Sequence, residues 1–327
     1  MHHQIYASIL EANNIVITSH KSPDGDSIGS SMALYQFIKR LEKTVDVVHP
    51  DPYPNFLSWI KDVGDIINYE NQLELATDKI QKADLIFCLD YNTAGRVGPM
   101  AEILESSAGK KIMIDHHLNP SDLAEIVLSK PEISSTAELI FEFINEVRPE
   151  MIDTNTGTPI YLGMMTDTGS FRFPSVTSRT HEVLAKLLAS GVVHNHVHEQ
   201  VFDQVSLSQL KLKSYAINQK LEMIENNQVA LISLSLEELN MYSYEKGDTE
   251  GLINMALAIK GVKMAVFVKE AEGLLKISFR SKHNVHVNQF AADYFEGGGH
   301  KYAAGGASFV DMEKTLEKIK THVAEYL

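Results

Sequence analysis

Aspartates and histidines that lie far apart in the sequence each follow a short apolar segment. The segments are 14–20, 84–90 and 110–117, and each has the apolar or β-branched composition of a buried strand. The residues that end or follow these segments, with one further aspartate downstream, are His20, Asp24, Asp26, Asp90, Asp115, His116, His117 and Asp167. Because the carboxyl ends of parallel strands lie at one edge of a sheet, we expect these side chains to converge there.

Such a cluster of acids and imidazoles would require cations. An isolated aspartate after a strand commonly caps a helix, but several carboxylates at contact distance repel one another. Carboxylate oxygens mixed with imidazole nitrogens suit Mn²⁺ or Mg²⁺, and the lack of cysteine ligands argues against a structural zinc site. Asp24-Gly25-Asp26 indicates two ions, since its alternating carboxylates can point at neighbouring sites. Two ions are the usual solution for displacement at phosphorus.

The first half of the chain alternates between predicted strands and predicted helices. The predicted strands are 14–20, 44–50, 84–90, 110–117 and 125–129. The predicted helices are 31–42, 71–83, 134–147 and a segment from 159 that ends near 166. Continuous apolar strands separated by helices predict a parallel sheet covered on both faces. Ser135 to Glu138 fits a capping box, and helix initiation is the simpler explanation of that motif, although it could also lie at the active edge of the sheet.

The second half of the chain has a different pattern. Segment 192–227 is typical of connecting helices. Its histidines in HNHVHE alternate rather than recur at the helical spacing of four residues, and we do not expect them to bind a metal. From 226 onwards we predict strands at 228–234, 262–270 and 274–282 and helices at 249–259, 287–295 and 312–326. The fold class is therefore α/β: an N-terminal parallel-sheet domain (1–190), a helical connector (191–225) and a smaller α/β domain with antiparallel strands (226–327). We expect a cleft between the two domains.

The composition is that of a globular protein without a broad basic surface. The chain has 327 residues, and 29 Lys and Arg against 43 Asp and Glu give a net charge of −14. This charge argues against a protein that coats long duplex nucleic acid. The single cysteine, Cys88, allows no internal disulfide, and the sequence contains no stretch typical of a membrane span or a secretion signal. We therefore expect a cytoplasmic protein with no membrane partner.

Four short motifs, in this order, resemble those of the DHH phosphoesterase superfamily. They are SHKSPDGDSIGS (19–30), the aspartate of LDYNTAGRVG (89–98), IDHHLNP (114–120) and the aspartate of TDTGSF (166–171). GGGHKYAAGG (297–306) resembles the GGGH motif of the C-terminal domain that accompanies one branch of the superfamily. The resemblance spans essentially the whole chain. The compact two-domain length of the chain is similar to that of the nanoRNase and pAp-phosphatase group, whose members are often labelled exopolyphosphatase-related.

The resemblance implies a role for each residue of the motifs. It implies that one metal ion is bound by His20, Asp24 and Asp90, and the other by Asp26, Asp90, His116 and Asp167. Asp90 would bridge the ions, and Asp115 would hold an imidazole in the ligating tautomer. His117 would contact the scissile phosphate or help to move a proton. Asp90, Asp115 and His117 are thus the expected catalytic residues, with two divalent cations as cofactors, Mn²⁺ by family habit and Mg²⁺ as the alternative.

Candidates for substrate binding lie mainly in the C-terminal domain. Three glycines before His300 allow backbone N–H groups to approach an anion, and arginine binds phosphate bidentately. The expected substrate-binding residues are Arg280, Ser281, Gly298, Gly299, His300 and Arg96. Arg96 and Arg172 lie close in sequence to Asp90 and Asp167, where either could help to bind phosphate or could form a surface ion pair.

The residues alone predict two-metal phosphoester hydrolysis, and the resemblance implies the substrates. These would be short single-stranded oligoribonucleotides, cleaved to mononucleotides, and the nucleoside bisphosphate pAp, which would lose its 3′-phosphate. A cyclic or linear dinucleotide phosphodiesterase would share every catalytic residue. A pyrophosphatase or exopolyphosphatase ranks lower because that branch carries a basic Arg-Lys motif instead of GGGH. A non-catalytic nucleotide sensor ranks last, because a sensor should lack some of the metal-binding residues and this sequence contains all of them. The sequence does not decide whether the protein forms a homodimer.

Overall fold

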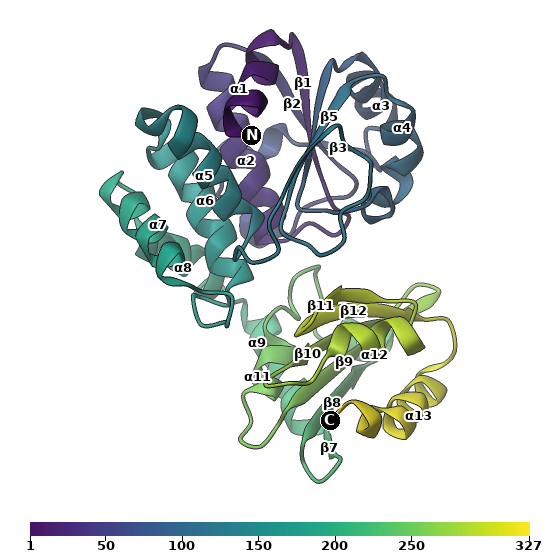
Figure 1. The fold of residues 1–327 in the computed structure, drawn as a ribbon. Helices are drawn as coiled ribbons and strands as arrows, with labels where there is room; N and C mark the ends of the chain where they lie inside the picture. Colours follow the sequence, from purple (N-terminus) through teal and green to yellow (C-terminus); the bar gives the residue numbers. More distant parts are fainter. The chain divides into compact units, whose positions relative to one another are not determined.

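The protein, described here for residues 1–327 by a computed structural model, divides into two compact units. They are Met1–Gln204 and Val205–Leu327, and each contains one six-stranded sheet (Figure 1). The predicted class is confirmed: an α/β fold with a parallel sheet in the first unit and a smaller α/β unit after it. The roles assigned to 1–190, 191–225 and 226–327, and the cleft, stay predictions.

The sheet of the first unit is wholly parallel, and its strand order reverses between β1 and β4. The order is β3-β2-β1-β4-β5-β6. The strands are β1 (Asn14–Ser19), β2 (Thr44–His49), β3 (Ile67–Asn68), β4 (Leu85–Leu89), β5 (Lys110–Asp115) and β6 (Ile126–Ser129). The five predicted strands are present, whereas β3 has two residues and too short a pattern to recognise. A ligand site is expected at the carboxyl ends of β1 and β4, where the order reverses.

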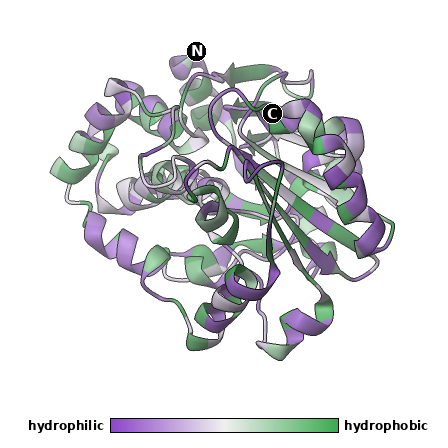
Figure 2. Ribbon diagram, turned by 90° about the horizontal axis from the view of Figure 1, so that it is seen from below, coloured by the Kyte–Doolittle hydropathy of each residue, from purple (hydrophilic) through white to green (hydrophobic).

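Apolar residues on both faces of this sheet explain its burial between helices. Ile17 contributes to the core on one face, and its neighbour Val16 contributes to the core on the other. The helices of this unit are α1 (His2–Glu11), α2 (Gly25–Arg40), α3 (Leu73–Lys82), α4 (Ala101–Ser106), α5 (Thr136–Val147), α6 (Thr154–Asp167), α7 (Ser178–Ala189) and α8 (His194–Phe202). In Figure 2 many helices carry alternating hydrophilic and hydrophobic bands, as expected for helices with one apolar face. None of them has the length and apolar character needed to span a membrane.

Helix α2 begins earlier than the predicted residue 31. The side chain of Asp24 caps the helix, and its Oδ1 accepts hydrogen bonds from the backbone N–H of Asp26 and Ser27 at 3.0 Å each. The first turn of α2 contains Gly25, which has no side chain. A Cβ at this position would overlap Thr166 of α6. A Cβ on Gly29 would overlap the backbone of α6 in the same way. The glycines of this motif thus allow α2 and α6 to approach closely.

The second unit has a mixed sheet with the order β11-β12-β10-β9-β8-β7. Only the pair β8–β9 is parallel. The strands are β7 (Leu221–Ile224), β8 (Val229–Leu234), β9 (Met264–Ala271), β10 (Leu274–Ser281), β11 (Gly298–His300) and β12 (Ala303–Ser308). The helices are α9 (Leu207–Tyr215), α10 (Leu236–Met241), α11 (Leu252–Leu257), α12 (Val287–Tyr294) and α13 (Met312–His322). The predicted strands and helices after residue 226 are all present.

Two local expectations were wrong, and one hairpin was not predicted. Residues 221–224 form the edge strand β7 rather than a connecting helix, because they pair with β8. The GGGH run, for which no strand was predicted, contributes β11 to the hairpin β11–β12. Histidines in HNHVHE do have helical spacing: His194 and His198 lie four residues apart on α8, and the hydroxyl of Tyr161 on α6 lies 3.2 Å from Nε2 of His198. They therefore contribute to the packing of α8 against α6.

Candidate active site

The carboxyl ends of β1, β4 and β5 bring the predicted residues together. His20 directly follows β1, and Asp90 directly follows β4. Asp115 is the last residue of β5, so that His116 and His117 come immediately after it. The remaining aspartates lie on helices: Asp26 is in the first turn of α2, and Asp167 is the last residue of α6. The structure therefore brings these residues together at one edge of the sheet, at the switch point of the strand order.

His20, Asp24 and Asp90 form the first of the groups that could hold a metal ion. Their candidate ligand atoms all lie within 4.8 Å of one another. Nε2 of His20 is 3.4 Å from Oδ2 of Asp90 and 3.8 Å from Oδ1 of Asp24. His20 and Asp90 are buried, whereas Asp24 is exposed.

The second group shares Asp90 with the first. It contains Asp26, Asp90 and His116, all buried and again within 4.8 Å. Nε2 of His116 is 3.5 Å from Oδ1 of Asp90, 3.9 Å from Oδ2 of Asp26 and 3.5 Å from Oδ2 of Asp167. The two oxygens of Asp90 thus face different histidines. One carboxylate borders both groups, as the predicted bridging role requires.

The imidazoles of both groups favour the protonated state when no cation is present. Burial alone would lower the pKa of His20, but contacts with Asp24 and Asp90 raise it well above its usual value. Burial likewise opposes the shift in His116, but the charges of Asp167 and Asp90 raise its pKa. The pKa of Asp90 is lowered despite burial, chiefly by its contact with His20. These protons occupy nitrogens that a metal ion would require.

Two other carboxylates, those of Asp26 and Asp167, have raised pKa values, in contrast to Asp90. These shifts indicate excess negative charge in the site. Burial and the charges of Asp90 and Asp167 raise the pKa of Asp26 well above its usual value. Burial and the charges of Asp24 and Asp90 raise the pKa of Asp167 to about 6. Divalent cations would relieve this repulsion, and mixed oxygen and nitrogen donors suit Mn²⁺ or Mg²⁺. The residues present therefore fit a divalent metal centre.

The N-terminus of α5 binds the carboxylate of Asp26. The backbone N–H of Thr136 donates to Oδ2 at 2.7 Å, and the N–H of Ala137 donates to Oδ1 at 2.9 Å. Only half of the predicted capping box forms: Ser135 accepts from the N–H of Glu138, but the Glu138 side chain binds Ser134 instead. The first turn of α5 therefore starts the helix and also belongs to the site, which the capping motif alone did not reveal.

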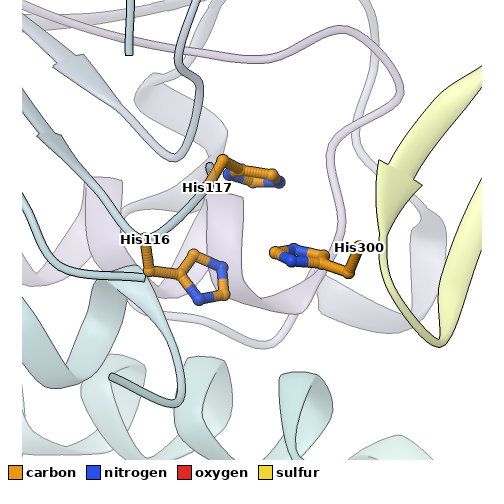
Figure 3. Close-up of side chains that lie close together, drawn as sticks. All are labelled: His116, His117 and His300. Carbon is orange, nitrogen blue, oxygen red and sulfur yellow. The ribbon is translucent and has the colours of Figure 1, made fainter. Parts of the chain in front are cut away.

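Asp115 and His117 form a hydrogen-bonded pair beside the two groups. Oδ1 of Asp115 lies 2.7 Å from Nδ1 of His117, and the Asp115 side chain is fully buried. This contact places the Nδ1 proton toward Asp115 and leaves Nε2 of His117 as the reactive nitrogen. The rings of His116 and His117 pack edge to face, with centroids 5.0 Å apart. Figure 3 shows these two side chains beside each other. Of the three side chains in Figure 3, His300 belongs to β11 of the second unit.

Arg280 and His300 lie on the same face of the second sheet. Arg280 pairs with Ala303 across β10 and β12, and His300 pairs with Ala303 across β11 and β12. Directly paired residues of an antiparallel ladder project to one face, so the small Ala303 separates the two larger side chains. The adjacent residues Phe279 and Ala304 project to the other face and are buried in the core.

Of the remaining predicted residues of the second unit, Ser281 and Gly299 have structural roles. The hydroxyl of Ser281 is buried and donates to the carbonyl of Val285 at 2.7 Å. Gly299 has a φ of +140°, and a Cβ there would lie 2.7 Å from the carbonyl oxygen of Ala303. A Cβ on Gly298 would meet nothing within 4 Å. Glycine is therefore required at 299 by the hairpin itself, whereas the space beside Gly298 is open.

The two arginines near the motifs of the first unit follow β4 and α6: Arg96 is part of a short 3₁₀ helix (Ala94–Met100), and Arg172 lies just after Asp167. Arg96 is exposed, and its carbonyl accepts a hydrogen bond from the N–H of Lys21 at 2.8 Å. This bond joins the loop after β4 to the loop after β1, so Arg96 lies at the same edge of the sheet as His20. Arg172 donates to the carbonyl of Gly169 at 2.6 Å.

Comparisons with known proteins agree with this architecture. Residues 14–164 match the family model of the DHH family, N-terminal domain, and residues 226–327 match that of the DHHA1 domain. A crystal structure of an exopolyphosphatase-related protein from Bacteroides fragilis has 39% identity, covers 99% of this chain and 96% of that one, and superimposes with a TM-score of 0.94. The chain belongs to the DHH family.

Two relatives are named for their activities. A Thermus thermophilus protein named bifunctional oligoribonuclease and PAP phosphatase NrnA is 28% identical, over 99% of this chain and 94% of that protein. A Bacillus subtilis protein named cyclic-di-AMP phosphodiesterase GdpP is 26% identical, over 99% of this chain and 49% of that protein. The resemblance detected in the motifs is therefore confirmed.

Proposed function

We propose that this protein is a two-metal-ion phosphoesterase that hydrolyses short oligoribonucleotides to mononucleotides and removes the 3′-phosphate of pAp. The observation that carries the proposal is the position of Asp90, whose two carboxylate oxygens face His20 and His116 in separate groups of ligands. The relative named as an oligoribonuclease and PAP phosphatase, which this chain matches along nearly its whole length, supports the substrate class.

The proposed ligands are those that the structure brings together. They are His20, Asp24 and Asp90 for one ion, and Asp26, Asp90, His116 and Asp167 for the other. Mn²⁺ is the proposed ion, with Mg²⁺ as the alternative. When bound, such ions acidify a water molecule and stabilise charge on phosphoryl oxygens.

The protein's own groups position the substrate and move a proton. Asp115 holds His117 through Nδ1, so that Nε2 can contact a phosphoryl oxygen or deliver a proton to the departing 3′-oxygen. Arg280 and His300, together on one face of the second sheet, would bind a phosphate other than the one attacked. Arg96 would add a positive charge at the edge of the first sheet.

A side-by-side hydrolysis assay with Mn²⁺ tests the proposal. The substrates are a 5′-phosphorylated diribonucleotide, a 24-mer RNA, pAp, cyclic di-AMP and pyrophosphate, with Asp90→Ala as the inactive control. We expect rapid release of mononucleotides from the diribonucleotide and of phosphate from pAp, both lost in the variant. Preference for cyclic di-AMP would support the phosphodiesterase alternative, which the relative named GdpP suggests. Nucleotide binding with no turnover of any substrate would overturn the catalytic reading in favour of a sensor.

A further inference from the structure

Thr136 contacts two carboxylates of the candidate metal centre. Its Oγ1 donates a hydrogen bond to Oδ1 of Asp90 at 3.0 Å, and its backbone N–H donates to Oδ2 of Asp26 at 2.7 Å. The threonine is fully buried at the first position of α5. One residue thereby connects the proposed bridging ligand to a ligand of the second group.

We propose that Thr136 is a positioning residue that sets the rotation of the Asp90 carboxylate, so that one oxygen serves each metal ion. The inference rests on the proposed function, because it presupposes that two ions bind around Asp90. It assigns to Thr136 a role in metal binding that the capping motif of α5 does not require, since a cap uses Ser135.

The Asp90 carboxylate requires such an external restraint. The terminal torsion of an aspartate is broad, so preferred rotamers alone do not decide which oxygen faces which side. Oδ2 faces Nε2 of His20 at 3.4 Å, and Oδ1 faces Nε2 of His116 at 3.5 Å. The hydroxyl of Thr136 occupies one lone pair of Oδ1 and leaves another for a ligand on the His116 side. Rotation of the carboxylate would break this hydrogen bond.

Threonine at this position can hold both carboxylates at a fixed spacing. Its β-branched side chain is restricted at χ1, and burial restricts it further, so Oγ1 has little freedom. Its N–H, in the first turn of a helix, lacks an acceptor within the helix and is available to Asp26. The relation between Asp26 and Asp90 is therefore maintained by the backbone of α5 and one short side chain.

Thr136→Val tests the hydroxyl alone, since valine keeps the shape and the backbone N–H to Asp26. Thr136→Ser restores the hydroxyl without the methyl group. Thr180→Val is the matched control: Thr180 is equally buried and its Oγ1 donates at 3.3 Å to Glu138, a carboxylate of α5 outside the metal groups. Mn²⁺ affinity and stoichiometry are measured by calorimetry on the metal-free proteins, and the coupling between two bound ions is measured by electron paramagnetic resonance. Thermal unfolding of the metal-free variants reports their folding.

We expect Thr136→Val to bind Mn²⁺ about 10- to 100-fold more weakly than wild type and to change the spin-coupling signature, as loss of a group that orients a ligand does. Thr136→Ser should recover most of the affinity, and Thr180→Val should match wild type in both readouts. Unchanged affinity and coupling in Thr136→Val would overturn the inference, as would equal losses in Thr136→Val and Thr180→Val. If wild type itself binds no pair of Mn²⁺ ions, the proposed function fails instead.

Discussion

Gly163 of α6 lies directly against the carboxylate of Asp26 on α2. A Cβ on Gly163 would lie 2.7 Å from Oδ1 of Asp26 and 2.5 Å from Cβ of Ala137. Three helices therefore meet at this glycine: α2 with its carboxylate, α5 with the N–H groups that bind the carboxylate, and α6. The geometry of the site depends on helix packing as well as on strand ends.

Gly163→Ala should disturb both packing and metal binding. The added methyl group would overlap the buried carboxylate of Asp26 and the side chain of Ala137 on α5, and neither can move freely. We therefore expect the free energy of unfolding to fall by about 1–3 kcal/mol. Mn²⁺ affinity should fall as well, since Asp26 must shift. Urea unfolding and calorimetry measure the two effects. Gly64→Ala is the control, because a Cβ there meets nothing within 4 Å. Wild-type stability and affinity in Gly163→Ala would contradict this account.

Asp90→Asn should abolish hydrolysis while preserving the fold. Asp90 has a φ of +62°, and asparagine tolerates this left-handed conformation as well as aspartate does. The amide removes the charge that borders both groups, so we expect turnover of the diribonucleotide to fall by more than about 100-fold, beyond the usual effect of an outer-shell change. Circular dichroism checks the fold. Asp78→Asn, which removes only an exposed pairing with Lys82, should retain activity; comparable losses in both variants would refute a special role for Asp90.

Asp115 and His117 should act as one unit. Asp115→Asn offers the imidazole an amide in place of a carboxylate, and His117→Gln removes the imidazole. We expect each variant to lower kcat about 10- to 100-fold with a smaller change in KM. The double variant should be little worse than either single one, because the 2.7 Å contact makes their effects non-additive. Multiplicative losses in kcat would show that the two side chains act independently.

Metal binding should strengthen as the pH rises. In the metal-free protein the pKa values of His20 and His116 are raised, and that of Asp167 is raised to about 6 by burial and neighbouring carboxylates. These groups therefore hold protons that bound cations must displace, and they hold more of them at low pH. Calorimetry in buffers of different ionisation enthalpy should show weaker Mn²⁺ binding and more proton release at pH 6 than at pH 8. Affinity independent of pH would contradict the proposed ligand set.

Arg280→Gln should weaken binding of phosphorylated substrates more than it slows chemistry. A charge-assisted hydrogen bond to phosphate contributes about 1.5–3 kcal/mol, which corresponds to a rise in KM of roughly 10- to 150-fold. The rise should be seen for the 5′-phosphorylated diribonucleotide and be smaller for the same dinucleotide without that phosphate. Lys320→Gln, which removes a surface pairing with Glu222 in the same unit, should leave KM unchanged. An equal effect of Arg280→Gln on both dinucleotides would place Arg280 outside the phosphate site.

The strand ends of the first unit were predictable from the sequence, and so was the convergence of the acids and histidines. Each buried parallel strand is a continuous apolar run, and the residue that ends it is evident from the change to polar residues. Asp90 and His20 could therefore be placed at one edge, because parallel strands share their carboxyl edge whatever their order. Family motifs then supplied the expected roles, which pattern and spacing do not contain.

Contacts between distant segments decided the rest. Thr136 and Ala137 bind Asp26 across 110 and 111 residues of sequence, and nothing local in the capping motif indicates this use of their N–H groups. Glycines 25 and 163 are required by helices that approach closely, not by a turn. The GGGH run resembles a flexible loop in sequence, yet it pairs with β12 as a strand. Local composition sets which residues are buried and where strands end. The acceptor of a backbone N–H group, and the neighbouring helix that leaves no room for a Cβ, are determined only when distant segments come together in the folded chain.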